Sequence, residues 1–193
     1  MSLREGRWAA GLTVLFASAC FSQDPRLCAA CHGPGGNSSA AGVPSIAAQP
    51  KAYLEQQLIL YREGLRVSDA MYPVAKNLKD AEIVRLAAHF SSIPLKPAAA
   101  AAGDPALLKA GARKAKQLRC NQCHGADYAG QAQIPRLAGQ REDYLEPEMR
   151  AYRDGKRPWG DSLMVAALYG VKDHEIRALA HFLSRSIPRA PAR

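Results

Sequence analysis

An internal duplication constrains this chain more than any other feature of its sequence. The segment Cys28-Ala29-Ala30-Cys31-His32-Gly33 recurs in the second half as Cys120-Asn121-Gln122-Cys123-His124-Gly125. Other pairs match at almost the same offset, among them Pro44 and Pro135, Gln49 and Gln140, Tyr61 and Tyr152, Gly64 and Gly155, and Met71 and Met164. A nearly constant offset of roughly 90 residues predicts two copies of one small fold in tandem.

A stretch rich in proline and alanine separates the two copies. Pro94, Pro97 and Pro105 would end the flanking helices, so we expect a linker over residues 96–103. Domain 1 then covers residues 20–95, and domain 2 covers residues 104–193. The few residues before Cys28 leave room for only a short first helix in domain 1.

The composition and the periodicity favour an all-α fold. Only 7% of residues are aromatic and alanine is abundant, which favours helices over sheets. Apolar side chains recur at helical spacing before Gly64 and Gly155, two glycines that suit helix C-terminal caps. We expect the last helix of each domain to begin near Asp80 or Asp173 as its N-cap, and a further helix to begin at Asp104.

Residues 1–19 have the features of an export signal. Arg4 and Arg7 precede a mostly apolar run of about 12 residues, and small residues at 17–19 fit a cleavage site. The run is short for a membrane span, and a lone N-terminal anchor is the competing interpretation. Cleavage after Ala19 would leave Cys20 first, as in bacterial lipoproteins, and lipidation of Cys20 would then tether the protein to a membrane.

Each Cys-x-x-Cys pair is followed at once by a histidine, and this combination is specific. Two thiols in this spacing reach both vinyl groups of one haem, and the next histidine can ligate its iron. We therefore predict two covalently attached haem c groups. The residues concerned are Cys28, Cys31 and His32 in the first half and Cys120, Cys123 and His124 in the second. Disulfides and zinc sites are the alternatives, but zinc would need a second pair of ligands in each half.

Methionines at matched positions are the candidates for the sixth iron ligand. Met71 follows His32 at almost the same separation along the chain as Met164 follows His124. Met71 has no rival in domain 1, whereas Met149 competes with Met164 in domain 2. Met149 falls on an apolar helical face, where a core role is more common. Methionine ligation raises the reduction potential and closes the iron to substrates, which favours electron transfer over catalysis.

The loop prolines are candidates for holding the histidines. A ligating histidine needs its second ring nitrogen fixed by a hydrogen bond. Pro44 follows His32, and Pro135 follows His124, at closely similar separations in the two repeats. A backbone carbonyl of each loop can therefore accept the Nδ1 proton. A simple turn proline is the other interpretation, and both can hold.

Together these residues resemble the di-haem cytochrome c4 family of tandem class I c-type cytochromes. The resemblance covers about residues 24–187 and rests on both Cys-x-x-Cys-His-Gly motifs, both proline loops, the Tyr-Leu…Tyr-Arg-x-Gly segments, and the two methionines. It implies two cytochrome c domains related by a pseudo-twofold axis, with the haem propionates near their interface. Arg66 and Arg157 are then candidates for contacts with the propionates. The short start of domain 1 departs from the family pattern.

By the same resemblance, the chain is expected to be a periplasmic electron carrier and not an enzyme. It would pass electrons from a quinol-oxidising complex to a terminal oxidase. A haem subunit of a membrane dehydrogenase or oxidase is an alternative that differs in the lifetime of the complex. A di-haem peroxidase or a sulfur-compound oxidoreductase would need one open iron, against which Met71 and Met164 argue.

The basic charge of the chain is uneven between the halves. There are 26 Lys and Arg against 17 Asp and Glu; residues 20–97 hold 8 basic and 6 acidic side chains, and residues 103–193 hold 16 and 10. Nucleic-acid binding would require basic stripes interleaved with aromatic residues, and the sequence contains none. Either the charge serves solubility, or domain 2 docks on an acidic patch of a redox partner. The candidate clusters are Arg113-Lys114-Lys116-Arg119 and Arg150-Arg153-Lys156-Arg157.

Overall fold

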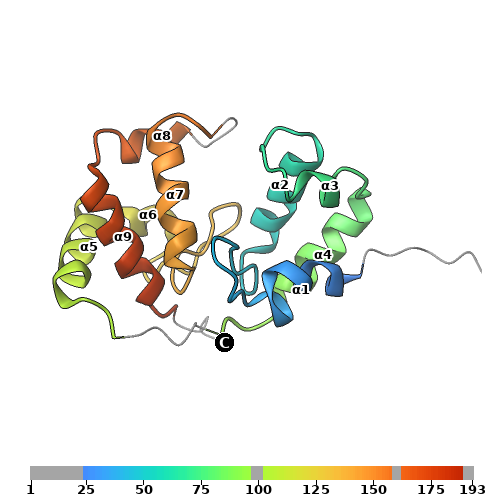
Figure 1. Ribbon diagram of the computed structural model, residues 1–193, viewed down its shortest axis with the longest axis horizontal. Helices are drawn as coiled ribbons and strands as arrows, with labels where there is room; N and C mark the ends of the chain where they lie inside the picture. Colours follow the sequence, from blue (N-terminus) through green and yellow to red (C-terminus); the bar gives the residue numbers. More distant parts are fainter. Residues whose placement is uncertain (1–23, 97–101, 158–161, 189–193) are drawn as a thin grey trace, which may run out of the picture.

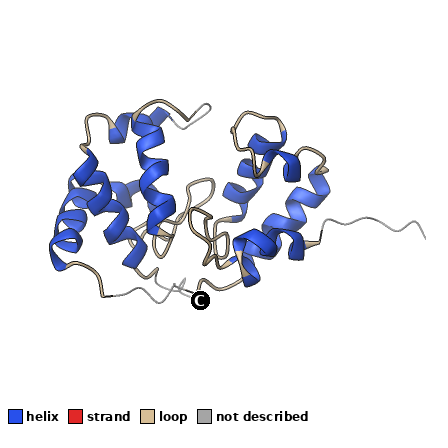
Figure 2. Ribbon diagram, viewed as in Figure 1, coloured by secondary structure: helices blue, strands red, loops and turns tan. Residues whose placement is uncertain are grey.

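The computed structural model describes residues 24–96, 102–157 and 162–188, and helices dominate these ranges (Figures 1 and 2). The helices are α1 (Pro25–His32), α2 (Lys51–Arg62), α3 (Tyr72–Ala75), α4 (Asp80–Ser92), α5 (Pro105–Gln117), α6 (Cys120–His124), α7 (Glu142–Arg153), α8 (Ser162–Leu168) and α9 (Asp173–Arg185), with a 3-10 turn at Pro34–Gly36. Within these ranges, the β pairing consists of one isolated bridge between Gln131 and Ile134. The all-α prediction is confirmed.

Some of the sequence predictions concern residues outside the ranges that the structure describes. The export signal, Cys20 and residues 97–101 of the linker lie outside the described residues. None of the described helices combines the length and the apolar composition needed to cross a lipid bilayer.

Two groups of helices lie side by side, with loops between them (Figures 1 and 2). One group contains α1–α4, and the other contains α5–α9. Each group buries its own apolar cluster, so each copy of the repeat has an independent core. The domain limits at residues 20, 95, 104 and 193 stay predictions.

The two cores are built mainly from the helices that the periodicity predicted. In domain 1, α2 packs on α4 and buries Leu54, Leu86 and Phe90. In domain 2, α9 packs against both α5 and α7 and buries Ile176 and Leu183. Burying a side chain of this kind contributes about 1.5–3 kcal/mol. These clusters therefore fix the scaffold on which the Cys-x-x-Cys-His segments are placed.

Domain 2 contains a helix crossing that the described part of domain 1 lacks. Gly111 of α5 lies so close to α9 that an added Cβ would stand 2.1 Å from the Ala178 carbonyl oxygen and 2.5 Å from Phe182 Cβ. The matched positions on α4 are Arg85 and His89, which are both exposed. In domain 1, α1 begins at Pro25 and itself carries the Cys-x-x-Cys-His motif. The face that is apolar on α9, with Ala178 and Phe182, is therefore polar on α4.

The glycine caps are confirmed, as are the starts of α4 and α9 at Asp80 and Asp173 and the start of α5 after its N-cap Asp104, but Asp80 and Asp173 are not N-caps. Gly64 and Gly155 follow α2 and α7 with φ of 67° and 64°. Lys79 and Lys172 occupy the N-cap positions of α4 and α9, and the aspartates are the first helical residues. In both helices, the glutamate in the first turn accepts the cap's backbone N–H, at 2.8 and 2.9 Å. Each aspartate instead pairs, at 2.6 Å, with the arginine that ends α2 or α7.

Candidate haem sites

The two predicted iron-ligating histidines are held in the same way. His32 ends α1 and His124 ends α6, and both are buried. In each case Nδ1 lies 2.8 Å from a backbone carbonyl oxygen, that of Pro44 or that of Pro135. A proton on Nδ1 makes Nε2 the ring nitrogen that can ligate a metal. Burial lowers the pKa of His32 although the hydrogen bond to Pro44 opposes this, so its imidazole is neutral at pH 7.

The four predicted attachment cysteines form two similar pairs. Cys28 and Cys120 are half-buried and pack against the apolar cores of their domains. Cys31 and Cys123 are exposed, one turn further along the same helices, and none of these four cysteines forms a disulfide. Burial raises the pKa of Cys28 and Cys120. One inner and one outer thiol on one helical face, next to the histidine that is predicted to ligate iron, suit the edge of a single haem.

The two predicted methionine ligands lie on the segments that precede the last helix of each domain. Met71 comes directly before α3, and Met164 lies in α8; both are partly buried. Met164 packs against the core of domain 2. The competing Met149 is 8% exposed and belongs to that core. The axial roles of Met71 and Met164 stay predictions.

Sequence reasoning missed a buried arginine beside the second histidine loop. Arg136 is 1% exposed, and its Nη atoms donate to the carbonyl oxygens of Ala138, Ser45 and Ala47 at 2.5, 3.3 and 3.1 Å. Its Nε has no partner among the described residues. Burial lowers the pKa of Arg136 to about 10, so it is still a cation at pH 7. The signal available in the sequence was an arginine directly after Pro135, where the first repeat has serine.

An isolated buried cation is costly, by several kcal/mol, unless an anion accompanies it. Arg136 is held by neutral carbonyl groups within the described chain, and its Nε is unsatisfied. A haem propionate near Arg136 would supply the missing charge and the missing acceptor. The residues of this loop therefore fit a bound haem.

The two arginines predicted to contact propionates lie at the interface between the domains. The Arg66 guanidinium stands 4.6 Å from the centre of the Tyr61 ring, and that of Arg157 stands 4.8 Å from the centre of the Tyr152 ring. Both arginines pair with Glu148 of α7, with Arg66 Nη2 at 3.3 Å from its Oε2. Because Glu148 already balances part of their charge, their contact with propionates stays a prediction.

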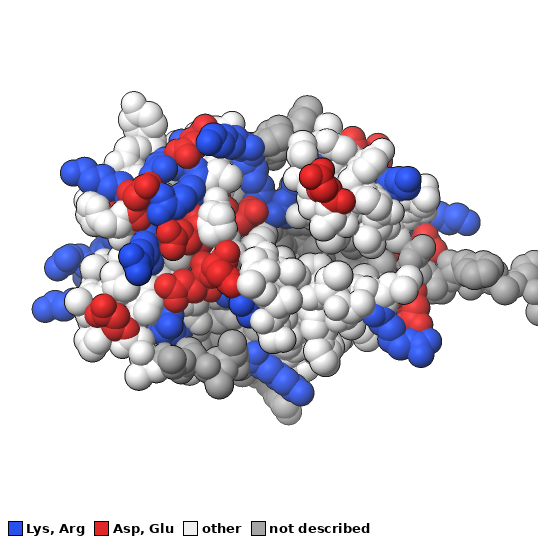
Figure 3. Space-filling view, in the orientation of Figure 1, with Lys and Arg blue, Asp and Glu red and all other residues white. Residues whose placement is uncertain are grey.

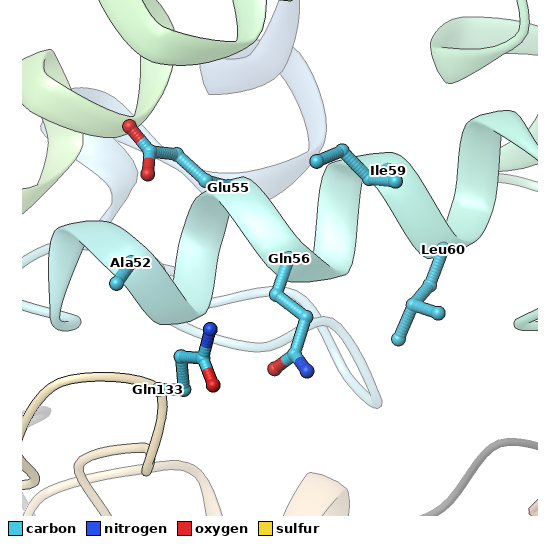
Figure 4. Close-up of a pocket in the computed structure, with 6 residues that line it drawn as sticks. All are labelled: Ala52, Glu55, Gln56, Ile59, Leu60 and Gln133. Carbon is cyan, nitrogen blue, oxygen red and sulfur yellow. The ribbon is translucent and has the colours of Figure 1, made fainter.

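A shallow pocket also lies between the domains. Gln133, on a domain 2 loop, faces one side of α2 across it (Figure 4). The lining residues are Ala52, Glu55, Gln56, Ile59, Leu60 and Gln133. None of the predicted cysteines or iron ligands lines it, so this pocket is separate from the candidate haem sites.

Comparison with known sequences finds the same organisation. The cytochrome c family model matches residues 17–94 and again residues 108–186. The thiosulfate dehydrogenase electron acceptor of Thiomonas intermedia (strain K12) is 34% identical over 183 residues, which is 86% of this chain and 81% of that protein. Cytochrome c4 of Thiocapsa roseopersicina is 34% identical over 165 residues, which is 81% of this chain and 85% of that protein.

Comparison with solved structures agrees. The crystal structure of reduced recombinant cytochrome c4 from Pseudomonas stutzeri matches with a TM-score of 0.75 and 29% identity, over 83% of this chain and 94% of that chain. Two tandem class I cytochrome c domains and two haem c groups are thereby confirmed, and the protein is an electron carrier of the c4 type. The chain therefore belongs to the di-haem cytochrome c4 family.

Proposed function

We propose that each domain holds its haem c through its own Cys-x-x-Cys-His segment. Cys28 and Cys31 would attach one haem, and Cys120 and Cys123 the other. The matched hydrogen bonds of the two histidines to loop carbonyl groups, both 2.8 Å long, support this most. They fix each imidazole before the cofactor arrives and increase its basicity toward iron. When bound, the haem iron carries one electron by alternating between its ferrous and ferric states.

We further propose that Met71 and Met164 close the two irons, so that the protein carries electrons without substrate chemistry. Their matched positions before α4 and α9 support this. The ferrous wild type should bind carbon monoxide poorly. Met71→Ala should open only haem 1, and Met164→Ala only haem 2, as followed by absorbance.

The matched control is Met149→Leu, which keeps the domain 2 core filled and should leave both haems closed to carbon monoxide. If one haem of the wild type binds carbon monoxide fully, an enzyme with an open iron is favoured and the carrier proposal fails.

For the physiological partners, we propose a periplasmic role between a quinol-oxidising complex and a terminal oxidase. A second candidate for the electron donor is a thiosulfate dehydrogenase, because one of the relatives is a thiosulfate dehydrogenase electron acceptor. In that case the chain would accept electrons from a dehydrogenase, transiently or as its haem subunit. Stopped-flow reduction by a purified quinol-oxidising complex and by a thiosulfate dehydrogenase, at equal concentration, separates the two donors. Lipidation of Cys20 would determine whether the carrier is tethered.

We propose that the partner docks on domain 2 and carries an acidic patch. Figure 3 shows charged side chains of both signs interleaved over domain 2, and a mostly uncharged surface over domain 1 on the same face. In the cluster Arg150-Arg153-Lys156-Arg157, the three arginines form ion pairs with carboxylates of their own domain. In the other cluster, Lys114 pairs with Glu175, while Arg113, Lys116 and Arg119 are exposed. All three are exposed on the segment that leads to Cys120, and Arg119 directly precedes this cysteine, so they are the better candidates.

Reversing Arg113, Lys116 and Arg119 to glutamate tests this docking surface. The on-rate of the partner should fall, and its dependence on ionic strength should flatten, because electrostatic steering governs transient encounters. The matched control reverses Lys76, Lys79 and Arg85, which are exposed in domain 1. Equal slowing by both sets, or by neither, would rule out this face of domain 2.

A further inference from the structure

We propose that Gln140 and Gln49 tune the two haems across the domain interface, each acting on the iron ligand of the other domain. The proposal rests on the proposed function, in which His32 and His124 ligate the irons. The two glutamines occupy matched positions of the repeat, just before α7 and α2 begin. They are buried, with exposed fractions of 3% and 4%.

Each glutamine binds the backbone of the opposite domain at both ends of its amide. The N–H of Ser45 donates to Gln140 Oε1 at 2.8 Å, and Gln140 Nε2 donates to the carbonyl oxygen of Ser45 at 2.9 Å. The N–H of Arg136 donates to Gln49 Oε1 at 2.9 Å, and Gln49 Nε2 donates to the carbonyl oxygen of Arg136 at 3.1 Å. The two contacts are therefore reciprocal and obey the symmetry of the repeat.

The peptide group that each glutamine accepts from is the one that holds a histidine. The Pro44–Ser45 peptide accepts the His32 Nδ1 proton at its carbonyl oxygen and donates its N–H to Gln140. Hydrogen bonds in series polarise one another, so an acceptor on the N–H makes the carbonyl a stronger acceptor. Gln140 in domain 2 therefore strengthens the hydrogen bond that fixes His32 in domain 1.

The same relay runs in the opposite direction. The Pro135–Arg136 peptide accepts the His124 Nδ1 proton and donates its N–H to Gln49. A stronger acceptor on Nδ1 makes the imidazole a more basic ligand, which favours ferric iron. Removing Gln140 should raise the potential of haem 1, and removing Gln49 should raise that of haem 2. By linkage, oxidation of haem 1 strengthens the contact between Gln140 and Ser45, and oxidation of haem 2 strengthens the contact between Gln49 and Arg136.

The experiment uses full-length protein with both haems and the variants Gln140→Leu and Gln49→Leu. Redox titration followed by NMR of the haem methyl signals gives a separate potential for each haem. For Gln140→Leu we expect an about two- to fivefold larger equilibrium constant for reduction of haem 1, with haem 2 unchanged. Gln49→Leu should give the mirror image. Gln133→Leu, an exposed position on the same domain 2 loop, is the control and should shift neither haem.

A purely structural role for the glutamines gives a different result. A shift confined to the haem of the substituted domain, an equal shift at both haems, or no shift at all would overturn the proposal. If Gln140→Leu fails to fold, Gln140→Asn keeps an amide at the interface and withdraws its oxygen by one methylene. A wild-type spectrum without histidine–methionine ligation would instead refute the proposed function on which the inference rests.

Discussion

Replacing Gly111 by alanine tests how the helix crossing of domain 2 is stabilised. The new Cβ would stand 2.1 Å from the Ala178 carbonyl oxygen, whereas an ordinary contact begins at 3.4 Å. The obstructing atom belongs to the backbone of α9, so α5 and α9 must separate by more than about 1 Å. Overpacking of this kind costs roughly 1–3 kcal/mol, and the better helix propensity of alanine returns about 1 kcal/mol. We therefore expect Gly111→Ala to destabilise domain 2 by up to about 2 kcal/mol.

The assay has to report on each domain separately, since a two-domain protein need not unfold in one step. Hydrogen exchange read by mass spectrometry should show faster exchange in α5 and α9, and unchanged exchange in α2 and α4. Lys109→Ala, at an exposed position of α5, is the control and should change stability by less than about 0.5 kcal/mol. If the amides of α5 and α9 in Gly111→Ala exchange as slowly as in the wild type or more slowly, the higher helix propensity of alanine outweighs the close contact, and the close-contact argument is wrong.

Two further predictions concern haem attachment and acid stability. His124→Ala should leave one haem per chain by pyridine haemochrome assay, because attachment is local to each domain; two intact six-coordinate haems would exclude His124 as a ligand. Burial opposes ionisation of Glu142, but hydrogen bonds from Arg185 and His181 outweigh it and lower its pKa. The stability that Glu142 contributes is therefore present above its unfolded-state pKa of about 4.3 and is lost as pH falls through the lower folded-state value. Glu142→Gln should flatten the fall of melting temperature below about pH 4, and equal slopes for variant and wild type would count against this pairing.

The sequence was informative where chemistry demands a fixed spacing. Two cysteines and a histidine at fixed positions, repeated in register, were enough to predict the cofactors and the two-domain fold. The loop prolines were also interpretable, because a ligating histidine needs an acceptor for its second proton. The contacts of His32 and His124 to the loop carbonyls have the predicted geometry.

Features that depend on tertiary partners could not be predicted in the same way. Asp173 suits an N-cap by its residue type, but arginines of α7 compete for its carboxylate in the folded chain. Arg150 belongs to a basic cluster in the sequence, but in the folded chain it forms ion pairs with Glu146 and Asp173, so its charge is already balanced. Gln140 was visible as a repeated residue, yet a repeat does not reveal that its partner lies in the other copy.

The α5–α9 crossing is encoded entirely within the second half of the chain, on both sides of the contact at Gly111. The described part of domain 1 has no such crossing, whereas the contacts of Gln140 and Gln49 with the opposite domain are reciprocal. The half of the chain that leaves the ribosome first is thus the half whose described residues lack this internal crossing. We expect domain 2 to reach its native packing before domain 1 does, an order that pulse-labelled hydrogen exchange during refolding can read from α4 and α9.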